Sequence, residues 1–343
     1  MKVGVFITNQ SFLDKDMVSA LDEQFAMVRL ARDKGWDSLF TGQHYLNAGN
    51  NKQLQAVPFL ARLQAEAGHM TCGLGVLLVP IHNPVYIAET VASLDIICRG
   101  NFVFGVGLGY REEEFDAFRV PMKQRVKRFT SHLELIKRLW TEESVTHEDE
   151  SCKLVNVRMN LRPVQKPHPP IWVAANQDVA VRRAARVGDA WMLNPHATLP
   201  TLVRQMALFR EERKVAKLPP PHAVPCVREI ICARNRKEAL ELAGPYLTAK
   251  YEAYTKWGQD EAMPGGDTID QPLEALITDR FIIGSPEDCY RQLEPYWKQA
   301  GANHLIFRAH WAGMPLGATL YSMRMISDEL LPALRKVLLL DNP

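Results

Sequence analysis

The stretch Thr71–Cys98, TCGLGVLLVPIHNPVYIAETVASLDIIC, contains the pattern that decides the fold. Residues 71–78 form a continuous, mostly apolar run, which is typical of a parallel strand buried on both faces. Pro84 follows at a position where proline begins a helix well, because its missing N–H would have had no partner there. The helical pattern then continues to about Cys98. A buried strand followed by such a helix predicts one unit of a parallel α/β fold.

The same alternation extends along the whole chain. Predicted strands occupy residues 3–8, 38–41, 71–78, 101–106, 171–174, 190–193, 224–233 and 304–308. Predicted helices occupy residues 21–34, 54–69, 84–98, 123–140, 179–187, 199–215, 237–257, 286–299 and 320–340. This order favours an α/β fold of the closed (β/α)8 TIM-barrel type over an open doubly wound sheet. We expect residues 1–343 to form a single barrel domain with a hairpin insertion at about 141–170 and a polar loop at about 258–275.

Composition and charge argue against several classes of protein. The chain of 343 residues is 47% apolar and 23% charged, the balance of a soluble globular protein with a sizeable core. The formal net charge is +2 and the signs are mixed, which argues against nucleic-acid binding. The basic run 119–128 is interpreted as a solvated helix face. No signal segment and no apolar run of roughly 20 residues is visible, so we expect a cytoplasmic protein without a membrane part.

The cysteines give no sign of a metal centre. They are scattered, without a Cys-x-x-Cys pair or histidines at zinc-finger spacing. We therefore predict reduced thiols and no bound metal. The six are Cys72, Cys98, Cys152, Cys226, Cys232 and Cys289.

Functional residues of a barrel gather at the carboxyl ends of its strands. His44, after the second strand, is the strongest catalytic candidate, because an imidazole moves protons and donates hydrogen bonds near neutral pH. The alternative is a histidine bonded to the backbone of a packed loop. Other polar or aromatic residues at strand ends are Asn9, Asn194, His310 and Trp311.

Two strand ends have features of a phosphate site. The turn Gly107–Tyr110 is rich enough in glycine for its backbone to approach a ligand, although its spacing does not match the dinucleotide fingerprint. Arg111 could neutralise a phosphate, or it could pair with the glutamates at 112–114 at the surface. Residues 174–177 precede a helix whose N-terminus suits a phosphate monoester, with a simple helix cap as the alternative.

A set of short motifs runs in order through nearly the whole chain. They are GQHY (42–45), LGVLLVPIHNPV (74–85), AE (88–89), LD (94–95), RGNFVFGVGLGY (99–110), the helix 128–140 that begins RF and ends LW, PPIWVAAN (169–176), GDAW (188–191) and GSPE (284–287). Each motif is weak alone, but their order and spacing together are specific. In these motifs the chain resembles the bacterial luciferase-like flavin oxidoreductases.

The resemblance implies a barrel with an insertion region and an oxidoreductase activity. Most members of this family use reduced FMN, supplied by a separate flavin reductase, together with dioxygen. The resemblance therefore implies an FMN-dependent monooxygenase that oxygenates a small organic substrate through a flavin hydroperoxide. It also favours a homodimer.

The resemblance also implies roles for individual residues. His44 would lie above the reactive face of the flavin, and a cis peptide near Gly75 and Val76 would support the ring. The ribityl-phosphate would be held by Gly107, Leu108, Gly109, Tyr110, Arg111, Ala175 and Asn176. The substrate pocket would include Asn9, Trp191, His310 and Trp311, with core packing as the alternative for Trp191. The chain departs from the family pattern at Asn176, where many members have serine, and at Ser131, often a glutamate.

Other functions remain open from the sequence. Some members of the family use a deazaflavin coenzyme and transfer hydride without oxygen chemistry. A flavin-degrading lyase, a non-catalytic flavin-binding protein and a phosphate-sugar barrel enzyme of unrelated chemistry are further alternatives. Substrate specificity in such barrels is held by loops, and the two insertions have no interpretable signature.

Overall fold

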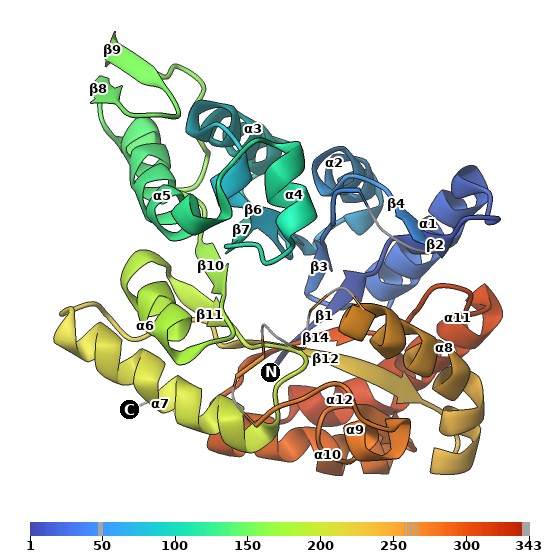
Figure 1. The fold of residues 1–343 in the computed structure, drawn as a ribbon. Helices are drawn as coiled ribbons and strands as arrows, with labels where there is room; N and C mark the ends of the chain where they lie inside the picture. The colour runs from blue at the N-terminus through green and yellow to red at the C-terminus, as the bar shows by residue number, and fades with distance from the viewer. Residues whose placement is uncertain (47–50, 257, 259, 261–262, 265, 338–343) are drawn as a thin grey trace.

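The centre of the fold is a curled parallel sheet, seen in a computed structural model that describes residues 1–46, 51–256, 258, 260, 263–264 and 266–337 (Figure 1). In hydrogen-bonded order its strands are β11 (Ala190–Met192), β10 (Ile171–Ala174), β7 (Phe102–Gly107), β5 (Thr71–Leu74), β3 (Ser38–Thr41), β1 (Lys2–Ile7), β14 (His304–Arg308), β12 (Pro225–Cys232) and β13 (Ile282–Gly284). An isolated parallel bridge between Leu193 and Cys226 joins the end of β11 to β12 and closes the wall.

All eight predicted strands are present, which confirms the predicted barrel-type α/β fold. The third is divided into β5 and β6 (Leu77–Leu78) by a bulge at Gly75 and Val76, and both parts pair with β7. The short strand β13 was not predicted, because three residues are too few to show a periodic pattern.

Helices cover the outer face of the sheet (Figure 1). They are α1 (Met17–Asp33), α2 (Ala56–Ala67), α3 (Pro84–Ile97), α4 (Glu112–Ala117), α5 (Arg125–Thr141), α6 (Asp178–Val187), α7 (Leu199–Val215), α8 (Arg236–Lys256), α9 (Leu273–Asp279), α10 (Pro286–Gln299), α11 (Leu316–Met325) and α12 (Leu331–Arg335). The last predicted helix, 320–340, is divided into α11, a π-helical turn at 326–330 and α12, and 338–340 lie outside the described residues. In the described part of the chain, no helix is both long and apolar enough to cross a membrane.

The hairpin predicted within 141–170 is present. Within 141–170, β8 (Val145–Glu148) and β9 (Lys153–Val157) pair antiparallel, and they project from the end of α5 (Figure 1). The second insertion was predicted as a loop, but its last residues begin α9, and residues 259, 261–262 and 265 lie outside the described residues. A further antiparallel pair, β2 (Gln10–Phe12) and β4 (Asn51–Gln53), lies near the ends of β1 and β3.

Apolar side chains fill both faces of the sheet. A large core lies between strands and helices, and a smaller cluster lies inside the barrel. In that smaller cluster Phe40 stacks on Trp172, with ring centroids 5.3 Å apart and planes 16° apart. Gly73 makes room for Phe40, because a Cβ there would lie 2.1 Å from Cε1 of the ring. The barrel interior is thus packed with side chains, and in this class of fold ligands bind toward the carboxyl ends of the strands.

Candidate functional site

A cavity of about 390 Å³ opens at the carboxyl ends of the strands. Its walls come from segments far apart in the chain, which the closed sheet brings together. Nine predicted site residues line it: His44, Gly75, Val76, Gly107, Leu108, Gly109, Tyr110, Ala175 and Asn176. The structure thus places most of the predicted site in one cavity, while the individual roles stay predictions.

One wall is the bulge between β5 and β6. The peptide bond between Gly75 and Val76 is cis, as expected from the resemblance. Glycines surround it: a Cβ on Gly42 would lie 2.4 Å from the carbonyl oxygen of Gly75, and one on Gly107 would lie 2.5 Å from Cγ2 of Val76. These contacts are closer than real Cβ atoms allow, so Gly42 and Gly107 are required for the bulge to sit against its neighbours.

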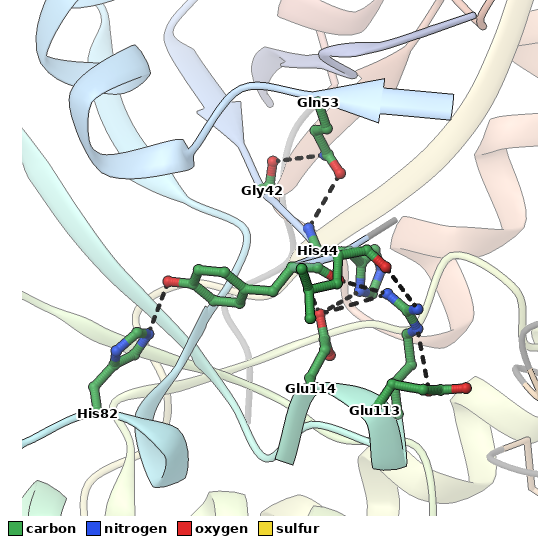
Figure 2. A network of polar contacts seen from close by, with 9 residues as sticks. Gly42, His44, Gln53, His82, Glu113 and Glu114 are labelled. Atoms are coloured by element: carbon green, nitrogen blue, oxygen red, sulfur yellow. Dashed lines mark hydrogen bonds and ion pairs between the residues drawn. The ribbon is translucent and has the colours of Figure 1, made fainter. Parts of the chain in front are cut away.

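His44 is held at the cavity by a buried carboxylate (Figure 2). Its Nδ1 lies 3.3 Å from Oε1 of Glu114, a side chain on α4 that is 1% exposed. The same oxygen accepts the backbone N–H of Tyr45 at 2.7 Å, and Gln53 accepts the N–H of His44 at 3.1 Å. An ionised Glu114 favours the His44 tautomer that carries its proton on Nδ1, which leaves the lone pair on Nε2. The sequence interpretation treated Glu114 as a surface charge and missed this contact.

Arg111, predicted to bind phosphate, stabilises the His44 loop instead. Its side chain is buried and is not among the described residues that line the cavity. The guanidinium donates to the carbonyl oxygens of Tyr45 at 3.0 Å and Leu46 at 3.3 Å, and it lies 3.8 Å from Glu114. The structure therefore places Arg111 behind the loop, where it neutralises the buried carboxylate.

The positive end of the cavity lies between α5 and α6. Asn176 precedes α6, and its carbonyl oxygen accepts a hydrogen bond from Nε2 of Gln205 at 2.7 Å. Arg125, at the start of α5, lines the cavity, and its Nε is buried without a hydrogen-bond partner among the described residues. Burial and the nearby Arg125 and Arg186 lower the pKa of Arg183, so cations concentrate here. A helix N-terminus and a guanidinium together suit an anion such as a phosphate.

The sequence interpretation missed Arg125 because it assigned the whole basic run to a solvated face. The helical period could have separated the residues that face the barrel from those that face solvent, but the run contains too few apolar residues to fix the phase.

The opposite wall is formed by β1, β12, β14 and α8, together with the loop that follows β11. Phe6 and Val227 contribute apolar surface, and Arg308, His196 and Tyr254 contribute polar groups. None of these five was predicted as a site residue. Arg308 ends a predicted strand, so the rule of strand ends could have selected it, whereas Tyr254 lies in a helix without a local signal.

The four residues predicted for the substrate pocket are not among the described residues that line the cavity. Trp191 faces the outer core, since Ala190 and Met192 on either side of it face inward, and its Nε1 donates to Ala175 O at 2.9 Å. Trp191 is therefore packed in the core, which was the alternative interpretation of this residue.

The other three are also engaged or buried elsewhere. Asn9 donates through Nδ2 to the carbonyl oxygen of Leu54 at 3.1 Å. Trp311 donates through Nε1 to Oε2 of Glu229 at 2.7 Å. Burial lowers the pKa of His310 to about 4, so its imidazole is neutral at physiological pH.

The loop that completes the seam of the barrel also lines the cavity. Leu193 to His196 follow β11, and the bridge from Leu193 to Cys226 is isolated rather than part of a ladder. Arg228, fully buried on β12, donates to the carbonyl oxygens of Asn194 at 2.9 Å and Ala197 at 3.3 Å. One side chain thus supplies hydrogen bonds that a continuous strand pair would otherwise make.

Comparison with known proteins agrees with this architecture. The model of the luciferase-like monooxygenase family matches residues 1–304. An F420-dependent glucose-6-phosphate dehydrogenase from Amycolatopsis mediterranei is 25% identical over 345 aligned residues, covering 98% of this chain and 99% of that protein.

Two solved structures show the same fold. The monooxygenase RslO1 from Streptomyces bottropensis superposes with a TM-score of 0.86 at 23% identity, covering 97% of this chain and 99% of that one. The oxygenating constituent of 3,6-diketocamphane monooxygenase from Pseudomonas putida, in complex with FMN, gives a TM-score of 0.78 at 20% identity, covering 99% of both chains.

Proposed function

Because the chain belongs to the luciferase-like monooxygenase family of oxidoreductases, we propose that it is an FMN-dependent monooxygenase. In this proposal a separate reductase supplies reduced FMN, and the enzyme uses it with dioxygen to oxygenate a small organic substrate. The observation that carries the proposal is the cavity itself. Arg125, the residues before α6 and His44, which Glu114 holds from behind, all line the same space.

The residues at the positive end fit an FMN phosphate. Arg125 brings a buried donor without a partner among the described residues, and α6 brings its N-terminus. Gly107 and Gly109 let the turn pack closely against Val76 and Phe115, and both glycines line the wall where a ribityl chain would pass. A phosphate dianion would make charge-assisted hydrogen bonds here, about twice as strong as neutral ones.

His44 would act next to the reacting atoms. Bound reduced FMN supplies the two electrons that activate dioxygen. The Nε2 atom of His44 would exchange a proton or hydrogen bond with the oxygen being transferred, while Glu114 holds the ring through Nδ1. Apolar groups such as Val76, Leu78 and Val227 would exclude water around them.

The first test is a binding titration with FMN, riboflavin and a reduced deazaflavin coenzyme. We expect reduced FMN to bind more tightly than reduced riboflavin, because riboflavin lacks the phosphate. Reduced FMN should then support substrate oxygenation under ¹⁸O₂, with one labelled atom in the product. Product that forms anaerobically, or without label, would contradict the monooxygenase proposal.

A deazaflavin-dependent hydride transfer is the second candidate. The similarity to an F420-dependent dehydrogenase over nearly the whole chain favours it. Anaerobic substrate reduction by the reduced deazaflavin, with no use of reduced FMN, would select it. Consumption of the flavin itself would indicate a lyase, and tight FMN binding without turnover would indicate a non-catalytic protein. The reductase partner and the homodimer stay predictions from the resemblance.

A further inference from the structure

A buried group of charges lies behind the cavity wall opposite Arg125. Glu229 on β12 is fully buried, and its Oε1 accepts a short hydrogen bond from Nζ of Lys250 on α8. Its Oε2 accepts the indole N–H of Trp311 at 2.7 Å. Arg308, at the end of β14, is the most distant of the three partners, with one terminal guanidinium nitrogen 3.5 Å from Oε1. Both oxygens of Glu229 therefore have closer partners than Arg308.

This group contains more positive than negative charge. Burial alone would raise the pKa of Glu229, but Lys250 and Arg308 outweigh it and lower the pKa, so the carboxyl is ionised. Burial lowers the pKa of Lys250 to about 8, which still leaves the amine mostly protonated at neutral pH. Two cations thus face one carboxylate, and among the described residues no other ion pair involves Arg308.

Burial and the same positive charges lower the pKa of the neighbouring His196. Burial, followed by Lys250, Arg308, Arg228 and Arg280, lowers its pKa, so its ring is neutral. His196 also lines the cavity, and its Nδ1 lies 2.9 Å from the hydroxyl oxygen of Tyr251.

Arg308 is the member of this group that reaches the cavity. Its guanidinium carbon lies 4.2 Å from the centre of the Phe6 ring, and both side chains line the cavity. Its Nε is buried without a hydrogen-bond partner among the described residues. The side chain is 12% exposed, so the charge is poorly hydrated and an anion would gain by approaching it.

The sheet separates this cation from the positive end at Arg125. Around the closed wall, β14 is separated from β10, the strand before α6, by β11 and β12 on one side and by β7, β5, β3 and β1 on the other, so Arg308 and the start of α6 belong to different parts of the wall. The cavity therefore has two cationic ends with apolar surface and His44 between them. A single phosphate at Arg125 leaves the second end unmatched.

We propose that Arg308 binds the charged oxygen of the substrate, and that this substrate is a small organic acid with an apolar body, a carboxylate or an ionised phenol. The proposal rests on the proposed function in treating the bound acid as the molecule that is oxygenated. The apolar body would lie against Phe6 and Val227, and the charged oxygen would pair with the Arg308 guanidinium.

The test uses matched pairs of acids and neutral analogues of the same shape. Benzoate and benzamide, phenylacetate and phenylacetamide, 2-naphthoate and 2-naphthamide, and 4-nitrophenolate and 4-nitroanisole are titrated calorimetrically into the full chain, with and without saturating FMN. We expect at least one acid to bind about tenfold or more tightly than its neutral partner. The carboxylate and phenolate pairs separate the two forms of the anion.

Substitutions then show which residue causes the preference for the acid over its neutral analogue. Arg308→Met should abolish the preference for the acid, and Arg308→Lys should retain part of it, because Lys keeps the charge without the fork of donors. Arg125→Met, a matched change at the other end, should leave the preference intact and weaken FMN. Glu229 keeps Lys250 and Trp311 in both Arg308 variants, and an unchanged thermal midpoint shows that they are folded.

Three outcomes would overturn the proposal. They are the absence of an acid preference in every pair, a preference that survives Arg308→Met, and a preference lost only in Arg125→Met. If Arg308→Met instead weakens reduced FMN and leaves the acids unaffected, the cation serves the flavin and the proposal is wrong. An acid preference at Arg308 in a protein that does not use FMN would leave this inference standing while the proposed function fails.

Discussion

The Nδ1 atom of His44 and the Oε1 atom of Glu114 lie 3.3 Å apart, although 70 residues separate them in the chain. The same carboxylate oxygen accepts the N–H of Tyr45, so one buried group fixes both the imidazole and the loop that carries it. Arg111 lies 3.8 Å from that carboxylate and donates to two carbonyl oxygens of the loop. The orientation of His44 therefore depends on α4, which begins only after the glycine-rich turn.

Glu114→Gln should lower kcat about 10- to 100-fold while FMN affinity stays close to that of the wild type. The amide keeps the shape of the side chain but not the charge that orients His44. In a double-mutant cycle, Glu114→Gln combined with His44→Ala should lower kcat no further than His44→Ala alone. The reason is that Glu114 acts on kcat through the His44 imidazole, which His44→Ala has already removed. Product per reduced FMN consumed is the measurement.

Glu113→Gln is the matched control, since that side chain is 70% exposed. It should leave kcat unchanged. If the losses from Glu114→Gln and His44→Ala simply add, then Glu114 acts on its own and not through the imidazole.

Arg125→Met should weaken FMN about 10- to 100-fold and leave riboflavin affinity unchanged, because the lost interaction is a charge-assisted bond to the phosphate. Fluorescence titration with both flavins measures the ratio. Lys127→Met, an exposed change two residues along α5, is the control and should preserve the preference for FMN. Equal weakening of both flavins would show that Arg125 supports the wall rather than the phosphate.

Gly107→Ala should destabilise the fold by about 1–3 kcal/mol through overpacking. Its Cβ would lie 2.5 Å from Cγ2 of Val76, on the bulge that lines the cavity, so flavin binding should fall as well. Gly317→Ala on α11 is the control, because its Cβ would meet nothing within 4 Å and alanine favours a helix. Urea unfolding of the two variants should give changes of opposite sign.

Stability should fall as the pH decreases from about 6.5, because buried neutral histidines must be protonated on unfolding. Burial lowers the pKa of His304 to about 3, and its ring nitrogen lies 2.7 Å from the Ser38 hydroxyl oxygen. In the unfolded chain the pKa of this histidine is about 6.5, so between pH 6.5 and 3 only the unfolded chain binds the proton, which stabilises it relative to the folded protein. From about pH 7.5 to pH 5 this one group costs about 2 kcal/mol.

His304→Gln should remove about 2 kcal/mol from the pH dependence of the unfolding free energy, whatever it does to the stability at neutral pH. Denaturant titrations at the two pH values measure the difference. Exposed His69, replaced by Gln, is the control and should keep the wild-type dependence. An unchanged dependence in His304→Gln would mean that His304 is protonated in the folded protein.

Periodic patterns predicted the parts of the fold that repeat. Each of the eight predicted strands has an apolar run, and the long helices have continuous helical patterns between turn residues, so both were visible without a structure. The resemblance located the cis bulge at Gly75 and Val76. Local patterns could not show β13 or α4, which are short, nor the π-helical turn at 326–330, which interrupts a helix that the pattern continues.

The sequence predicted the parts of the site that the backbone forms at strand ends. It was less successful with parts that depend on the direction of a side chain. Gly107 and Ala175 line the cavity because a strand end places them there. The direction of a side chain depends on contacts distant in the chain: Trp191 faces outward against Phe209, and Trp311 turns to Glu229. Arg308 could be placed at a strand end, but the excess of buried charge around it exists only in the folded protein.

The barrel wall lacks a strand ladder between β11 and β12, so the cavity can change its shape there without loss of strand pairing. An isolated bridge at Leu193 and the donors of Arg228 hold the segment 193–196, whereas the other walls are held by strand ladders. Substitutions in this segment can alter the contour of the cavity without unzipping a strand. Leu193, Asn194 and His196 are nevertheless buried, and His196 contacts the Tyr251 hydroxyl, so divergence toward new substrates at positions 193 to 196 would have to repack side chains but would leave every strand ladder intact.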